Sequence, residues 1–92
     1  MLNYTFVFYY SNIKKVESVK RSLAIRNKCE ELDLAYVGHG DLDTIIKYGK
    51  GYFDVGRDAN TTVHIIVVMD KVEAIIGFED FELINYEDFI SP

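Results

Sequence analysis

The sequence predicts a small α+β domain in which a mixed β-sheet carries two helices, in the order β-α-β-α-β-β with an acidic ribbon at its C-terminal end. Three observations favour this class. An apolar, aromatic segment lies at 3–10, a segment of helical composition without glycine or proline follows at 12–32, and two apolar, β-branched runs come after residue 62. A chain of 92 residues can bury one modest core, so we expect residues 1–92 to form a single domain.

The first strand and the first helix come from the N-terminal third. "NYTFVFYY" is largely apolar on both faces, which is typical of a central strand. Ser11 is a plausible N-cap for a helix over about 12–32. At about 100° per residue the apolar positions of this helix form two stripes on opposite sides, Val16, Val19 and Leu23 on one and Ile25, Cys29 and Leu32 on the other. Either the core contacts both sides, or the helix kinks near residue 24, or its second half packs on something other than the sheet, for which a partner subunit is one candidate.

The remaining elements are shorter. "LAYVG" predicts a strand at 34–38, and "GDLDTIIKYGKG" predicts a short helix capped by Asp41, which ends at its glycines and turns Leu42, Ile45 and Ile46 inward. "YFDVGRDANTT" is typical of a turn-rich connection with a short strand at 52–55. "VHIIVVMDKVEAIIGF" predicts a tight hairpin at 63–78 that turns through Asp70 and Lys71.

The composition of the sequence indicates the cellular compartment in which we expect the protein. The N-terminal segment lacks a basic region and a small-residue cleavage site, and no apolar run has the 18 or more residues of a membrane span. The lone cysteine, Cys29, cannot form an intramolecular disulfide. We therefore expect a cytoplasmic protein without a membrane partner.

Charge is distributed unevenly along the chain. Residues 1–50 hold eight basic and six acidic side chains, whereas residues 51–92 hold two basic and nine acidic ones. Nucleic-acid binding depends on lysine and arginine that neutralise phosphates. The acidic half therefore argues against direct binding of DNA or RNA.

Catalytic and metal chemistry find little support. "VGHGD" places His39 near Asp41, a candidate base with an orienting acid, but glycine and aspartate also serve strand-to-helix turns for conformational reasons. His64 lies in an apolar strand without a second ligand at zinc spacing, and Cys29 suits a packing role. We therefore expect a non-enzyme with no catalytic residue, metal or cofactor, and an enzyme built on His39 and Asp41 is the weakest alternative.

The segment "GFEDFELINYEDFI" at 77–90 is the most unusual part of the sequence. It holds five carboxylates and four aromatic rings without a lysine or arginine, and "FEDF" recurs as "YEDF" eight residues later. As an extended strand it would present Asp80 and Glu82 as neighbouring charges, while Phe81 and Leu83 anchor the other face. The sequence leaves open whether 78–90 is strand or helix.

Like charges placed this closely repel one another, so their excess indicates a basic partner surface. Calcium loops need a different order of ligands, which leaves carboxylates standing in for DNA phosphates. The candidate partner-binding residues are Asp54, Asp58, Asp70, Glu73, Glu79, Asp80, Glu82, Glu87 and Asp88. The alternatives are a solvated acidic edge that mimics nothing, and a small protein-interaction or regulatory domain without DNA mimicry.

The length, the acidity, the abundance of lysine, asparagine, tyrosine and isoleucine, and "GFEDFELINYEDF" resemble small early proteins of T-even bacteriophages. Among these the chain is most similar to the Arn family of anti-restriction DNA mimics. The resemblance implies a homodimer that blocks the DNA-binding site of a host protein, namely the modification-dependent restriction endonuclease McrBC. The acidic segment alone predicts a target that is either a host nuclease or a nucleoid protein.

Overall fold

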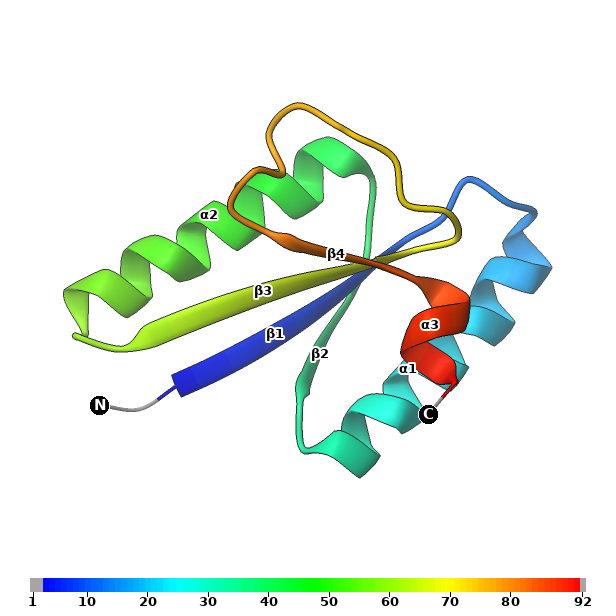
Figure 1. Cartoon of the computed structure of the whole chain (residues 1–92), viewed down its shortest axis with the longest axis horizontal. Helices are drawn as coiled ribbons and strands as arrows, with labels where there is room; N and C mark the ends of the chain where they lie inside the picture. Colours follow the sequence, from blue (N-terminus) through cyan, green and yellow to red (C-terminus); the bar gives the residue numbers. More distant parts are fainter. Residues whose placement is uncertain (1–2, 92) are drawn as a thin grey trace.

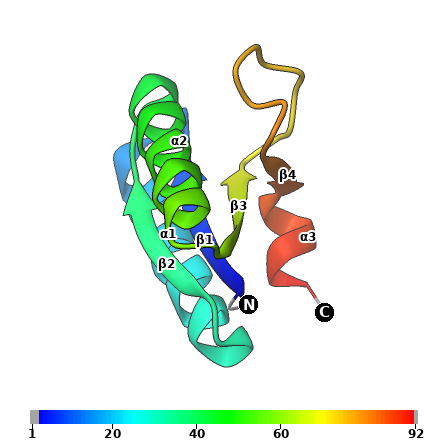
Figure 2. The same ribbon diagram turned by 90° about the vertical axis from the view of Figure 1, so that its left-hand side faces the viewer.

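The sheet consists of four parallel strands in the spatial order β2-β1-β3-β4, and the computed structural model describes residues 3–91. Figure 2 shows these strands side by side, with β4 at the outer edge. The elements are β1 (Asn3–Tyr10), α1 (Lys15–Leu32), β2 (Ala35–His39), α2 (Leu42–Asp58), β3 (Thr62–Met69), β4 (Glu82–Asn85) and α3 (Tyr86–Ile90). The predicted α+β class is confirmed, but every strand pair within 3–91 is parallel, so the sheet is not mixed, and a third helix is present.

The central strand β1 divides the core into two layers. Val7 and Tyr9 are fully buried against Ile25 and Cys29 of α1, whereas Phe8 points to the other face, where it packs in the same cluster as Ile45 of α2. The first crossover runs from β1 to β2, and the second runs in the opposite direction, from β2 past β1 to β3. Because crossovers between parallel strands are right-handed, α1 and α2 come to lie on opposite faces. The prediction of a central first strand is confirmed.

Helix α1 begins three residues later than predicted, and Ser11 is not its N-cap. Lys14 occupies that position without a side-chain hydrogen bond, while the Ser11 hydroxyl donates to Asp70 Oδ2 at 2.7 Å. The second half of α1 packs on the sheet through Ile25 and Cys29. The stripe that faces away from the sheet is therefore the one formed by Val16, Val19 and Leu23, which are 71%, 51% and 55% exposed.

Helix α2 extends to Asp58, so the predicted end at its glycines is wrong, and so are the turn-rich connection and the strand at 52–55. The Asp41 cap is confirmed, because its carboxylate accepts from the Thr44 amide at 2.8 Å. Gly49 is buried within the helix, where a Cβ would meet the Phe81 ring at 2.6 Å, and a Cβ at Gly56 would collide with the Val63 side chain. These two glycines allow close packing and do not end the helix.

The predicted hairpin at 63–78 is wrong. Strand β3 ends at Met69, and residues 70–81 form a loop that buries Phe78 and Phe81 against the α2 face before β4 joins β3 in parallel. Helix α3 follows at once and buries Phe89 on the α1 face. Figure 1 shows the loop arching from β3 to β4 and α3 lying beside α1. The segment 78–90 thus contains loop, strand and helix in turn.

Candidate functional site: an acidic sheet edge

Six exposed carboxylates lie on the consecutive segments that form the β4 side of the molecule. We call this group the acidic edge. Its members come from the loop 70–81, from β4 and from α3, and they are Glu73, Glu79, Asp80, Glu82, Glu87 and Asp88. Residues 70–91 carry a formal charge of −6, with Lys71 as their one cation, whereas residues 1–69 carry +1, and together these give the −5 of the chain. The negative charge of the protein is therefore concentrated on one edge of its sheet.

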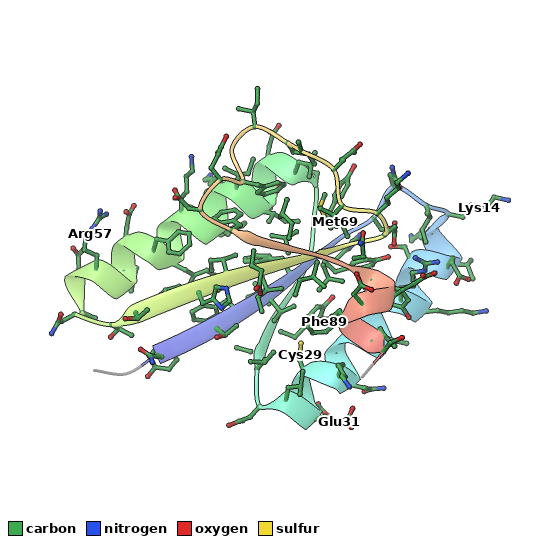
Figure 3. The ribbon with its side chains drawn as sticks, in the orientation of Figure 1. Lys14, Cys29, Glu31, Arg57, Met69 and Phe89 are labelled. Carbon is green, nitrogen blue, oxygen red and sulfur yellow. The ribbon has the colours of Figure 1, made fainter. Side chains whose placement is uncertain are left out.

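Buried aromatic rings hold this edge in place. Phe78 and Phe81 lie 5.2 Å apart between ring centroids and pack in the core layer on the α2 side of the sheet. Phe89 packs in the other layer, in the cluster that contains Cys29, and Figure 3 shows these two side chains in the region between α1 and α3. The predicted arrangement, in which aromatic rings anchor the segment and carboxylates stay in solvent, is confirmed at these residues.

Three carboxylates of the edge have local polar partners. Glu79 accepts from the Gly77 amide at 3.0 and 3.1 Å, and this backbone hydrogen bond lowers the pKa of Glu79. Asp88 accepts from the Asn85 side-chain amide at 3.3 Å. Glu82 Oε2 lies 3.6 Å from His64 Nε2, and both side chains are about half exposed. Within residues 3–91 no lysine or arginine forms an ion pair with the acidic edge, although the charge of Lys50 contributes to the lowered pKa of Glu79.

Two predicted carboxylates lie on α2, outside the segments that form the acidic edge. Asp54 forms an ion pair with Arg57, and Asp58 is the last residue of the helix. Asp80 shares a shallow recess with Asp54, Arg57 and Lys50. Because this recess mixes both signs of charge, the uniformly negative surface ends there.

Asp70 has a structural role that the sequence analysis did not anticipate. Its carboxylate accepts from the Tyr9 hydroxyl at 2.6 Å, from Ser11 at 2.7 Å and from Arg21 at 3.2 Å. The Arg21 guanidinium also lies 4.6 Å from the centre of the Tyr86 ring. Asp70 therefore joins β1, α1 and the end of β3, and its oxygens are occupied within the fold. A single acid directly after the apolar run 65–69 was the available signal in the sequence.

The Asp70 contact predicts a pH dependence of stability above neutrality. Burial and the hydrogen bond to Asp70 raise the pKa of Tyr9 from 10.0 to about 12. The folded state therefore holds this proton more tightly than the unfolded state, so the contribution is complete below pH 10 and is lost between pH 10 and 12. Urea unfolding across this range should show a loss of about 2–3 kcal/mol in excess of that of Tyr9→Phe, and equal pH profiles for the two proteins would contradict the assignment.

The residues considered for catalysis have roles in the fold. The Asp41 carboxylate is engaged as the α2 cap, and exposed His39 ends β2 with its ring 6.0 Å from the ring of Tyr9. Cys29 is buried, which raises the pKa of its thiol to about 11 and disfavours the nucleophilic thiolate. Among residues 3–91 there is no group of three or more histidine, cysteine, aspartate or glutamate side chains that could hold a metal ion.

None of the helices within the described residues is long and apolar enough to cross a membrane. Comparison of the chain with protein-family models, with curated proteins and with solved structures gives no match. The acidic edge is therefore interpreted from its own residues and geometry.

Proposed function

We propose that the protein is a non-enzymatic, acidic DNA mimic that occupies the DNA-binding site of a host protein in the cytoplasm. The favoured target is the modification-dependent restriction endonuclease McrBC, and a nucleoid protein is the other candidate. The observation that supports this proposal is the acidic edge, where six exposed carboxylates lie on segments anchored by buried phenylalanines, without a lysine or arginine partner among the described residues.

The physical basis is the similarity between a carboxylate and a phosphate oxygen as hydrogen-bond acceptors. A DNA-binding surface presents lysines and arginines that form charge-assisted hydrogen bonds to phosphates, and carboxylates accept the same bonds. A fixed array also costs less ordering entropy on binding than a disordered acidic tail does. The carboxylates of segment 78–90 form such a fixed array, because Phe78, Phe81 and Phe89 are at most 8% exposed and hold the segment against the core.

The test is displacement of labelled DNA from the DNA-binding subunit of McrBC at several salt concentrations. The natural protein should displace DNA, and its affinity should fall steeply as salt rises, as the affinity of DNA itself does. The variant Asp80→Asn/Glu82→Gln/Glu87→Gln should bind at least about tenfold more weakly with a shallower salt dependence, because three charge-assisted contacts are lost.

A matched control removes the same charge elsewhere. The variant Glu31→Gln/Asp33→Asn/Asp43→Asn changes three exposed carboxylates outside the acidic edge. It should displace DNA almost as well as the natural protein. If both variants weaken binding equally, net charge and not the acidic edge is responsible. If the natural protein displaces no DNA from McrBC even at low salt, that target is rejected, and the same assay with a nucleoid protein decides the general proposal.

The second candidate function is a small protein-interaction domain without DNA mimicry. It is favoured by the exposed apolar stripe of Val16, Val19 and Leu23 on α1, because a contiguous apolar face on a soluble helix is typical of a contact surface. Binding through this stripe should depend little on salt. Salt dependence of target binding therefore separates the two functions.

A further inference from the structure

Strand β4 forms one edge of the sheet and pairs with β3 in an unbroken register. The pairing runs from Glu82 to Asn85, and no other strand within residues 3–91 pairs with the outer side of β4. Figure 2 shows β4 as the outermost strand on this side. Successive backbone amide and carbonyl groups of a strand point to alternate edges, so about half of those in β4 point away from β3. Such an edge is a template on which another strand can pair.

The opposite edge of the sheet is less regular. It is formed by β2, whose register with β1 shifts between Val7 and Phe8, and Gly38 within β2 has a φ of 139°. A bulge of this kind is one of the features that keep an edge strand from pairing further. Of the two edges of the described sheet, β4 is therefore the one that offers a regular ladder.

The α1 face of the β4 edge is acidic. Leu83 packs in the core layer on the α2 side and Ile84 in the layer on the α1 side. Glu82 shares its face with Ile84, because side chains two positions apart along a strand point the same way. Helix α3, which packs on this face through its buried phenylalanine, adds the exposed Glu87 and Asp88 in its first turn. Three carboxylates of the acidic edge thus border β4 on its α1 face.

The α2 face of the same edge is apolar. Here β4 and the loop 70–81 together line a recess of about 310 Å³, to which Leu83 contributes from the strand. Ile76 belongs to this recess and is 92% exposed, although it lies in the acidic part of the chain. The remaining lining residues are Ala74, Ile75, Phe78 and Glu79. A free strand edge beside an apolar recess is the arrangement by which proteins bind an added strand, with the backbone on the edge and alternate side chains in pockets.

We propose that the outer edge of β4 binds an extended segment of a partner protein in which basic side chains alternate with apolar ones. The backbone of the segment continues the ladder of β3 and β4. Its basic side chains meet Glu82, Glu87 and Asp88 on the α1 face, and an apolar side chain enters the recess beside Leu83 on the α2 face. The alternation in the partner follows from the difference between the two faces of the edge.

The charge of the edge determines which segment it accepts. Residues 70–91 carry a formal charge of −6. A second copy of this chain would set carboxylates against carboxylates, and like charges on neighbouring strands destabilise their pairing. Lysine and arginine side chains are attracted at the same positions. The binding deepens the proposed function and rests on it in one respect, namely that the partner presents a basic surface. Because β4 has four residues, the contact is small and its affinity should be modest.

The test of strand pairing uses a short labelled peptide in which lysine alternates with valine, and fluorescence anisotropy measures its binding to the natural protein. Two further peptides carry N-methyl groups, one on its lysine amides and the other on its valine amides. Only one of these sets of amides faces β4, so one methylated peptide should bind at least about tenfold more weakly than the other. Equal binding by the two methylated peptides, or no binding of the unmethylated peptide even at low salt, would overturn the proposal.

Further comparisons test the two faces. A peptide with glutamate in place of lysine should not bind, and binding as strong as that of the lysine peptide would refute the choice of a basic partner. Ile76→Ser should weaken binding of the lysine peptide at least about threefold, because the recess loses apolar contact area. Val55→Ser is the matched control, since Val55 is 67% exposed on α2 outside the recess. An equal effect of the two substitutions would refute the contribution of the recess.

These experiments involve neither DNA nor McrBC, so their failure is distinguishable from failure of the proposed function. If the protein displaces DNA from McrBC and the two methylated peptides bind equally, DNA mimicry stands and strand pairing is refuted. If the methylated peptides differ as expected and no DNA is displaced, strand pairing stands and McrBC is rejected as the target.

Discussion

Replacing Phe81 with alanine should lower the free energy of unfolding by about 3–5 kcal/mol, the usual cost of deleting a buried phenylalanine ring. Phe81 is 7% exposed, and its ring lies 5.2 Å from that of Phe78 and 5.6 Å from that of Phe53 between centroids. The same ring packs against the backbone of Gly49, which has no side chain. No small side chain can fill this space from the helix, so the cavity should persist. Urea unfolding followed by far-UV circular dichroism measures the loss.

The control for this experiment is Ile76→Ala in the same loop. Ile76 is 92% exposed, so its removal should change stability by less than about 0.5 kcal/mol. A loss below about 1 kcal/mol for Phe81→Ala would mean that the loop 70–81 is not packed on the α2 face as described, and the rigidity assigned to the acidic edge would then lose its basis.

Asp70→Ala should lower the free energy of unfolding by about 3 kcal/mol, although it removes a negative charge from an acidic protein. The Asp70 side chain is 12% exposed and accepts from Tyr9, Ser11 and Arg21. Its removal leaves the hydroxyl of fully buried Tyr9 without this acceptor and leaves Arg21 without its closest anion. Chemical denaturation at neutral pH measures the effect.

Asp80→Ala provides the comparison, because it removes the same charge from an exposed site on the acidic edge. Relief of like-charge repulsion should make this variant neutral or slightly more stable. If Asp70→Ala were also neutral or stabilising, Asp70 would belong with the surface carboxylates, as the sequence had suggested, and not with the core contacts.

The sequence predicted secondary structure correctly where a pattern of residues is typical of only one element. The apolar faces of 3–10 predicted a central strand, and Asp41 before an amphipathic run predicted a helix start. Glycine misled because it has two uses. Gly49 serves close packing within α2 where a helix end was predicted, and Gly56 does so where a turn-rich connection was predicted. Asp70 misled for a similar reason. An acid and a lysine between apolar runs are typical of a turn, but here the acid is held by residues of β1 and α1 about 50 to 60 positions away.

The candidate site was predictable in composition but not in arrangement. The count of carboxylates and the anchoring role of Phe81 follow from the printed residues. The placement of Asp54 and Asp58 on α2, and not in a turn-rich connection, depends on the full length of that helix, which local pattern did not give. The exposure of Val16, Val19 and Leu23 depended on which of two equivalent stripes the sheet would cover, and that choice is made by tertiary packing.

The pairing of β1 with β3 determines the stage of synthesis at which the sheet can form. Residues 3–10 find their central neighbour only in residues 62–69, so the first strand made is completed by one of the last. Closing a loop of this length costs entropy before any sheet contact offsets it, and proteins dominated by such distant contacts fold more slowly than helical bundles of equal size. During synthesis the apolar strand β1 therefore lacks its full pairing with β3 until residue 69 of the 92 has been made.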